Sequence, residues 1–341
     1  MRLIAAVFML AVALAPLRVL AQLTPSPALL ALSKRDHTLA IVDPVSLKVV
    51  GKVPVGDDPH EVIASTDGKT AYVSNYGFGA FNTLAVIDLV AQKPLTPVDL
   101  GALRGPHGLT FVGGKTWFTA EGAKAIGSYD PATKKVDWIL GTGQNRTHMI
   151  YVTEDLQRIY TTNVSSGTVS IMEKSAATGS STSSRLMAIP GGDWNETVVR
   201  VGDGSEGFDV TPDSKEIWVA NAHDGTISII AIPVKTASQT LNANVRSANR
   251  LKITPDGKLA FVSMLGAGDV AVFDVASRKE VKRIPVGHGA AGIEMQPDGS
   301  RVFVACTPDN YVTVIDVKSL AVVGHIDVGP EPDGLAWAVR R

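Results

Sequence analysis

Cysteine and aromatic residues are scarce in this sequence. Its 341 residues include one cysteine, Cys306, and 6% aromatic residues. A single thiol cannot form an internal disulfide, so a disulfide-stapled fold is excluded and packed secondary structure must provide the stability. Cys306 falls at the end of a predicted strand. We expect it to be a small buried side chain, and a reactive thiol facing the axis of the fold is the alternative.

An excess of charge of either sign is also absent. The chain has 32 lysines and arginines against 33 aspartates and glutamates, a formal net charge of −1. No basic block or basic–aromatic stripe occurs, so nucleic acid is not an expected partner. The sequence also lacks GxSxG, HExxH, CxxCH and P-loop motifs, and a GxGxxG motif followed by a helix. These absences argue against dinucleotide-dependent chemistry and phosphoryl transfer.

Long apolar runs are confined to the first residues. Arg2 precedes an apolar run over 4–14, and a small-residue cleavage site ends at Ala21. This pattern predicts a signal peptide over 1–21. The run is too short to span a bilayer comfortably, and an uncleaved anchor is the alternative. We therefore expect a periplasmic or secreted mature protein over 22–341 without a transmembrane segment.

The sequence does contain a segment that repeats about every 42 residues, a period typical of propeller blades. Each copy has an alternating apolar run, a turn of the PDG, TDG or PDS kind, and a second run richer in β-branched residues. The clearest copies are 59–77, 206–225, 249–268 and 291–310.

Alignment of the copies places the start of an innermost strand at seven positions. These are His60, His107, His148, Glu206, Asn249, Ala291 and Asp333. Seven starts predict an all-β, seven-bladed β-propeller whose blades each have four antiparallel strands. Segment 332–341 supplies only an inner strand, whereas 28–56 lacks one. We therefore expect a single domain in which the N- and C-terminal strands share one blade and close the ring.

One interval between inner strands is longer than the others and contains a polar stretch over 175–197. We expect a loop insertion there. It is either a tolerated surface insertion or a lid or partner-binding loop.

Short motifs in the repeats carry a family resemblance. YVSN (72–75), WVAN (218–221) and FVSM (261–264) follow PDG-type turns and precede VIDV-type strands. They resemble the repeats of YVTN propellers, a family of exported bacterial and surface-layer proteins. The resemblance covers essentially the whole mature chain and implies the propeller fold. Segment 59–79 is also similar to lactonase-type propellers related to phosphogluconolactonase, and this similarity implies a lactone hydrolase.

Polar residues concentrate where the inner strands begin, at one mouth of the axial channel of a propeller. The ligand-binding candidates are His60, His107, His148, Glu121, Glu206, Asn249, Arg250 and Asp333. Polar residues can also line a wide, water-filled channel without any function, so this structural interpretation stays open.

Three kinds of chemistry fit these residues. His60, His107 and His148 come from consecutive blades and, with a nearby carboxylate, would suit Zn²⁺, Fe²⁺ or Cu²⁺. Oxygen donors would suit Ca²⁺, and the candidates are Glu206, Asn163, Asn221 and Asp333. A metal-free site would use a histidine as general base and Arg250 to hold an anionic substrate. The catalytic candidates are His107, Glu206 and Arg250.

Two classes of function remain. The first is an exported propeller that binds a small molecule, a glycan or an exported protein at the mouth of the channel. The alternative is a lactonase-like hydrolase or lyase, with a divalent metal as candidate cofactor. The sequence identifies no reaction, and we favour the binding class.

Overall fold

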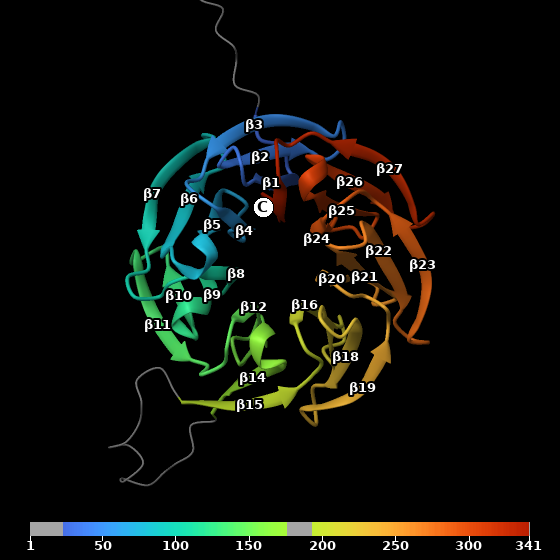
Figure 1. The fold of residues 1–341 in the computed structure, drawn as a ribbon. Coiled ribbons are helices and arrows are strands. Elements are labelled where there is room, and N and C mark those ends of the chain that lie inside the picture. Colours follow the sequence, from blue (N-terminus) through green and yellow to red (C-terminus); the bar gives the residue numbers. More distant parts are fainter. Residues whose placement is uncertain (1–22, 176–192, 341) are drawn as a thin grey trace, which may run out of the picture.

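The computed structural model describes residues 23–175 and 193–340, which form seven four-stranded antiparallel sheets. The sheets surround a central axis like the blades of a propeller (Figure 1). The predicted fold class, blade number and strand number are confirmed. No helix in the described part of the chain is long and apolar enough to cross a membrane.

The strands follow one order in every blade, from the axis outward. The innermost strands are β28 (Pro332–Ala338), β4 (Pro59–Ala64), β8 (Pro106–Val112), β12 (Thr147–Val152), β16 (Ser205–Val210), β20 (Ala248–Ile253) and β24 (Ala290–Met295). The second strands are β1 (Ala28–Ser33), β5 (Thr70–Asn75), β9 (Lys115–Ala120), β13 (Arg158–Asn163), β17 (Glu216–Asn221), β21 (Leu259–Met264) and β25 (Arg301–Cys306).

The third strands are β2 (Thr38–Asp43), β6 (Thr83–Asp88), β10 (Ala125–Asp130), β14 (Thr168–Lys174), β18 (Thr226–Ala231), β22 (Asp269–Asp274) and β26 (Tyr311–Asp316). The outer strands are β3 (Lys48–Pro54), β7 (Lys93–Asp99), β11 (Lys135–Gly141), β15 (Trp194–Arg200), β19 (Thr236–Asn242), β23 (Lys279–Pro285) and β27 (Ala321–Ile326). Single turns of 3₁₀ helix follow four second strands: η1 (Gly77–Gly79), η2 (Glu121–Ala123), η3 (Val164–Ser166) and η4 (Thr307–Asp309).

The expected loop insertion over 175–197 extends too far at its C-terminal end. Trp194 begins β15, which pairs with β14 along its whole length, so 194–197 belong to the outer strand of the fourth blade. Most of the stretch, 176–192, lies outside the described residues.

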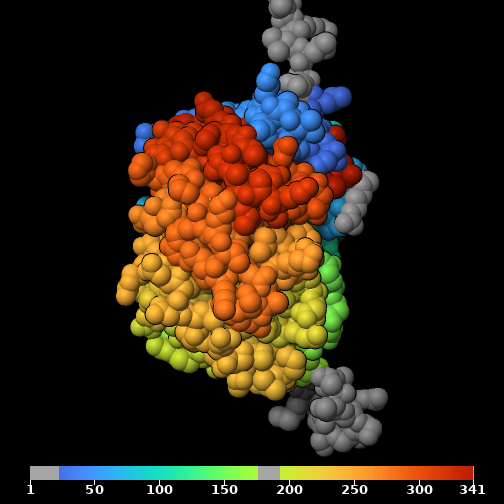
Figure 2. Space-filling view, turned by 90° about the vertical axis from the view of Figure 1, so that its right-hand side faces the viewer, coloured from blue at the N-terminus to red at the C-terminus, as the bar shows by residue number. Residues whose placement is uncertain are grey.

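The ring closes as predicted, with both ends of the chain in one blade. The sheet order is β28-β1-β2-β3, and Leu30 of β1 pairs with Ala336 of β28. The blue beginning and red end of the chain therefore lie against each other (Figures 1 and 2). This pairing gives β1 a partner strand on each side, and β28 becomes the innermost strand of the blade.

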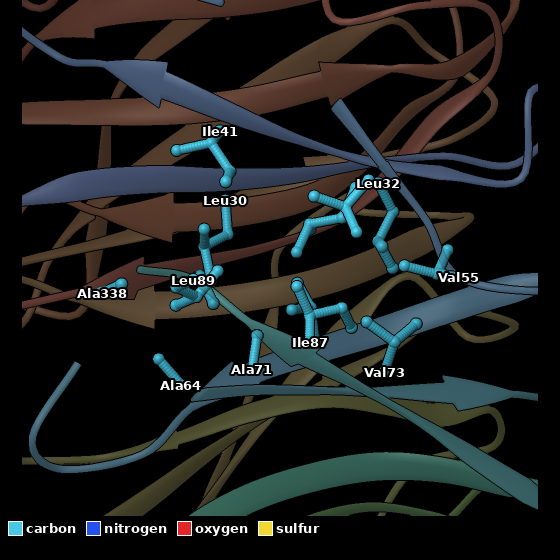
Figure 3. Close-up of a cluster of buried hydrophobic side chains, with 14 of the residues drawn as sticks. Leu30, Leu32, Ile41, Val55, Ala64, Ala71, Val73, Ile87, Leu89 and Ala338 are labelled. Atoms are coloured by element: carbon cyan, nitrogen blue, oxygen red, sulfur yellow. The ribbon is translucent and has the colours of Figure 1, made fainter. Parts of the chain in front are cut away.

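Apolar side chains between adjacent blades hold the ring together. Figure 3 shows one such cluster, in which Leu30 and Ile41 of the first blade face Val73 and Ile87 of the second. All four side chains are fully buried. Complete burial of a side chain of this size contributes about 1.5–3 kcal/mol. These contacts bring each inner strand close to the next.

The turns between inner and second strands explain the PDG-type signal. In the second blade, Asp67 accepts hydrogen bonds from the Ser65 hydroxyl and the Lys69 N–H. Gly68 adopts a φ of +66°, the left-handed conformation that glycine tolerates best. Asp213 and Asp256 accept the same pair of bonds in the fifth and sixth blades. The carboxylate thus locks a tight hairpin.

The pairing is irregular near the start of every inner strand. The pairing between inner and second strand shifts register in all seven blades. The predicted strand starts are therefore each one residue inside the strand: Pro59 opens β4 and His60 follows it. In four blades, a glycine is the third residue of the inner strand. At one of these, Gly292, an added Cβ would lie 2.1 Å from the Asp333 carbonyl oxygen.

Candidate functional site

Two kinds of element meet at one end of the axis. Each inner strand begins opposite the end of the second strand, as Pro59 pairs with Asn75 and Pro106 with Ala120. The loops that follow the second strands therefore lie at the same end and contribute Tyr76 and Glu121. We call the resulting set of side chains the axial cluster. It comprises Lys34, Asp58, His60, Glu61, Tyr76, His107, Glu121, Arg146, His148, Glu206, Asn249, Arg250 and Asp333.

His148 lies buried between two carboxylates. Its Nδ1 is 2.5 Å from Glu121 Oε1, and its Nε2 is 2.7 Å from Glu206 Oε2. The Tyr76 hydroxyl donates to Glu121 Oε2 at 2.5 Å. Arg146 lies 3.6 Å from Glu121 and 3.5 Å from Glu206. Consecutive blades thus form a continuous chain of acid, imidazole and acid.

The charges of this chain are mutually dependent. Burial alone lowers the pKa of His148, but Glu206 and Glu121 outweigh burial and raise it. Burial raises the pKa of Glu206, yet the nearby His148 and Arg146 bring it down to about 2. Burial also raises the pKa of Glu121, but its hydrogen bonds with His148 and Tyr76 outweigh burial and lower it. His148 therefore serves as the cation between two carboxylates.

His107 is a neutral imidazole without a hydrogen-bond partner. It is 0% exposed, and neither ring nitrogen has a partner among the described residues. Its ring centroid lies 3.8 Å from that of His148 and 4.4 Å from that of His60. Burial and the adjacent histidines hold the pKa of His107 well below its usual range. A neutral imidazole keeps one nitrogen lone pair, which can bind a metal or accept a proton.

His60 belongs to a separate group. Its Nδ1 lies 3.1 Å from Asp333 Oδ2 and 2.7 Å from Lys34 Nζ. Lys34 in turn contacts Asp58 at 3.2 Å. Burial raises the pKa of Asp333, but His60, Lys34 and Arg250 hold it well below its usual range. The proposed set of three histidine ligands is thus divided, with His60 held by the last strand of the chain.

Arg250 differs from the role expected for it. It forms a buried ion pair with Glu61, and these residues come from blades that are not neighbours in the ring. Arg250 is 5% exposed and Glu61 9%. The guanidinium that was expected to hold an anionic substrate is therefore already neutralised by a carboxylate. Deeper along the axis, Lys252 and Glu294 form a second ion pair at 2.9 Å.

The oxygen set expected for calcium is not brought together. The Asn163 amide donates to Thr168 and Ser170 of its own blade. Asn221 makes the equivalent bonds to Thr226 and Ser228. Both amides thus support the blade rather than face a ligand. The Oδ1 atoms of Asn221 and Asn249 are both buried and have no partner in the part of the chain that the structure describes.

Sequence reasoning missed Tyr76 and Arg146. Tyr76 lies at the end of the copy 59–77, where the copies differ in sequence, and Arg146 lies in the loop before an inner strand. The signal that could have found Arg146 is its position two residues before His148, in the loop that enters an inner strand. Cys306 is the expected small buried side chain: its Sγ–H donates to the Val286 carbonyl at 3.3 Å, and burial raises the pKa of the thiol to about 11.

Two searches found no relative of this chain: no family model matches it, and no curated protein does. Solved structures do resemble it. A protein of unknown function from Desulfotomaculum acetoxidans has a TM-score of 0.74 at 15% identity, covering 93% of this chain and 100% of that one. Hydrazine synthase from Kuenenia stuttgartiensis has a TM-score of 0.68 at 19% identity, covering 83% and 90%.

A candidate 6-phosphogluconolactonase from Bacteroides uniformis has a TM-score of 0.72 at 15% identity, covering 92% of this chain and 99% of that one. A second such candidate, from Bacteroides fragilis, has a TM-score of 0.69 at 16% identity. At these identities the likeness extends to the fold alone. The chain is a seven-bladed β-propeller, similar in architecture to proteins with different or unknown activities.

Proposed function

We propose that this protein is an exported propeller of the YVTN type that binds a small polar ligand at the axial cluster. The observation that supports this proposal is a concentration of buried side-chain atoms without partners at one end of the axis. In the described residues these include both nitrogens of His107 and Oδ1 of Asn249. Buried polar atoms are nearly always satisfied, so such a concentration favours a ligand, an ion or bound water.

The accessible part of the cluster favours an acidic ligand. The Arg146 side chain is 40% exposed, and Lys34 is 22% exposed. The contacts of Arg146 with Glu121 and Glu206 are 3.6 and 3.5 Å long, and a guanidinium has five N–H donors. Donors therefore remain for an incoming carboxylate or phosphate. A small acid with hydroxyl groups would match the cations at the rim and the polar groups beneath them.

The binding proposal is tested with three probes: gluconate, 6-phosphogluconate and glucose. We expect thermal shift and calorimetry to detect binding of at least one of the two acids and weaker binding of neutral glucose. Arg146→Gln should reduce the affinity at least roughly tenfold, because a charge-assisted bond contributes about 1.5–3 kcal/mol.

Arg158→Gln is the matched control, since Arg158 pairs with Glu173 at the opposite end of the strands. No binding of either acid, or an equal loss in both variants, would refute the proposal.

Lactone hydrolysis at the same site is the second candidate. His107 favours it, because a neutral buried imidazole is suited to act as a general base. The likeness to two candidate 6-phosphogluconolactonases suggests the substrates to test. Proton release from gluconolactone and 6-phosphogluconolactone should exceed the spontaneous rate and return to it in His107→Ala. Equal rates with and without the protein would exclude this activity for these lactones.

A further inference from the structure

We infer that His107, Glu121 and His148 form a site for a divalent transition metal. One ligand atom from each of these three side chains lies within 4.8 Å of the other two. A tetrahedral ion with metal–nitrogen bonds of about 2.1 Å separates its ligands by roughly 3.4 Å. A modest rotation of the side chains would therefore bring the three donors to bonding distance.

The donor set selects the class of metal. Two imidazoles and one carboxylate occur together at catalytic Zn²⁺ sites and at non-haem Fe²⁺ sites. Ca²⁺ and Mg²⁺ prefer sites made of oxygen donors, so they fit this set poorly. Three protein ligands would leave a position for water or for a ligand oxygen.

The burial of His107 is compatible with a single bound ion. Its imidazole is fully buried beneath Tyr76, His60 and His148, and both ring nitrogens are unpartnered. A single ion requires no more space than its own coordination sphere.

The surrounding residues would hold the ligands in place. Glu206 lies 2.7 Å from His148 Nε2 and would keep that nitrogen protonated, so a metal would bind at Nδ1 in place of the proton that this nitrogen shares with Glu121. A carboxylate on the distant nitrogen of a ligating histidine is a common supporting feature of metal sites. Tyr76 fixes the other Glu121 oxygen by its hydroxyl hydrogen bond. These contacts would orient both His148 and Glu121.

The site predicted here differs from the three-histidine set expected from the sequence. His60 is engaged by Asp333 and Lys34. The inference therefore requires that His60 be dispensable for metal binding and that Glu121 be necessary. That distinction makes the experiment decisive.

The test measures binding of Zn²⁺ by metal-stripped full-length protein, using calorimetry and competition with a chromophoric chelator. We expect one equivalent of Zn²⁺ in the wild type. His107→Gln and Glu121→Gln should each weaken binding at least about 100-fold. His60→Gln should keep the affinity within about threefold, as should His288→Gln. His288 is 87% exposed and pairs with Asp309, so it controls for metal held by surface histidines.

A second measurement covers the case in which a variant folds poorly. The visible spectrum of Co²⁺-loaded wild-type protein reports nitrogen and oxygen ligands directly, and Zn²⁺ should displace the Co²⁺. Failure of the wild type to bind either metal would overturn the inference. Binding that survives His107→Gln, or that disappears equally in His60→Gln, would overturn it too.

The inference shares its site with the proposed function, but the two can fail separately. Binding of 6-phosphogluconate and gluconate is measured on the metal-stripped protein and again after addition of Zn²⁺. Acid binding without metal binding would reject the metal site and keep the ligand site. Metal binding without acid binding would reject the ligand site and keep the metal site.

Discussion

At the scale of single residues, the axial cluster is held by charges that neutralise one another. His148 forms ion pairs with two carboxylates, and Arg250 forms an ion pair with Glu61. Buried charges are stable only with such partners, and removal of one member leaves the other unpaired at a large cost. His107 is the exception, a neutral side chain without hydrogen-bond partners among residues 23–175 and 193–340. The axial cluster thus combines paired charges with the neutral His107 imidazole.

Replacement of Asp333 by asparagine should make the free energy of unfolding less dependent on pH in the acidic range. Because the folded-state pKa of Asp333 lies below its unfolded value, its contribution is present above about pH 4 and is lost as the pH falls. Asp333→Asn should lower the free energy of unfolding by roughly 2–3 kcal/mol at pH 7. At pH 2 the difference should be less than about half of that at pH 7.

Urea unfolding at the two pH values measures this difference. Asp57→Asn is the control, because the Asp57 side chain is 78% exposed. An equal deficit of Asp333→Asn at both pH values would show that the loss is one of packing and not of charge.

Cys306 should be unreactive in the folded protein. Its thiol is fully buried, and burial raises its pKa to about 11, so little thiolate forms at pH 8. Modification by a disulfide reagent should be at least about 100-fold slower than in denaturant, because it requires opening of the structure. The measurement is the rate of absorbance change with and without guanidinium. Rapid labelling of the native protein would contradict the buried position.

At the scale of the element, close contact between inner strands requires glycine. Gly292→Ala would place a Cβ 2.1 Å from the Asp333 carbonyl oxygen in the adjacent strand. Overpacking of this kind costs about 1–3 kcal/mol. Gly141→Ala is the matched control, because a Cβ there meets nothing within 4 Å. Urea unfolding should show a clear loss for Gly292→Ala and little change for Gly141→Ala. Similar values for both would mean that the strands can separate freely.

The sequence predicted elements better than side-chain directions. Repeat spacing and hairpin turns were sufficient for the blades, since both are local features that recur. The strand starts were misplaced by one residue, because a bulge adds a residue that no periodicity reveals. His60 lies next to His107, with ring centroids 4.4 Å apart, but its Nδ1 contacts Asp333 and Lys34 of the closing blade, which the repeat does not predict. The partnership of His148 with Glu121 and Glu206 depends on loops and bulges that the repeat does not describe.

At the scale of the whole molecule, the ring depends on its last strand. A chain that ends after Glu331 would lack β28 and leave β1 as an unpaired edge. We expect this truncated protein to aggregate, and a synthetic peptide of residues 332–341 to restore part of the monomer. Light scattering after size-exclusion chromatography measures both. A truncated chain that remains a folded monomer would show that the ring does not need closure.

The closing blade also sets the order in which the site can form during synthesis. Ser33 and Pro330, which are joined by a hydrogen bond, lie 297 residues apart in the chain. The ribosome therefore releases the partners of β28 long before β28 itself exists. Because Asp333 holds His60 from that last strand, an interrupted translation product would lack part of the axial cluster even if most blades had folded. The candidate site is therefore complete only after β28 has been synthesised.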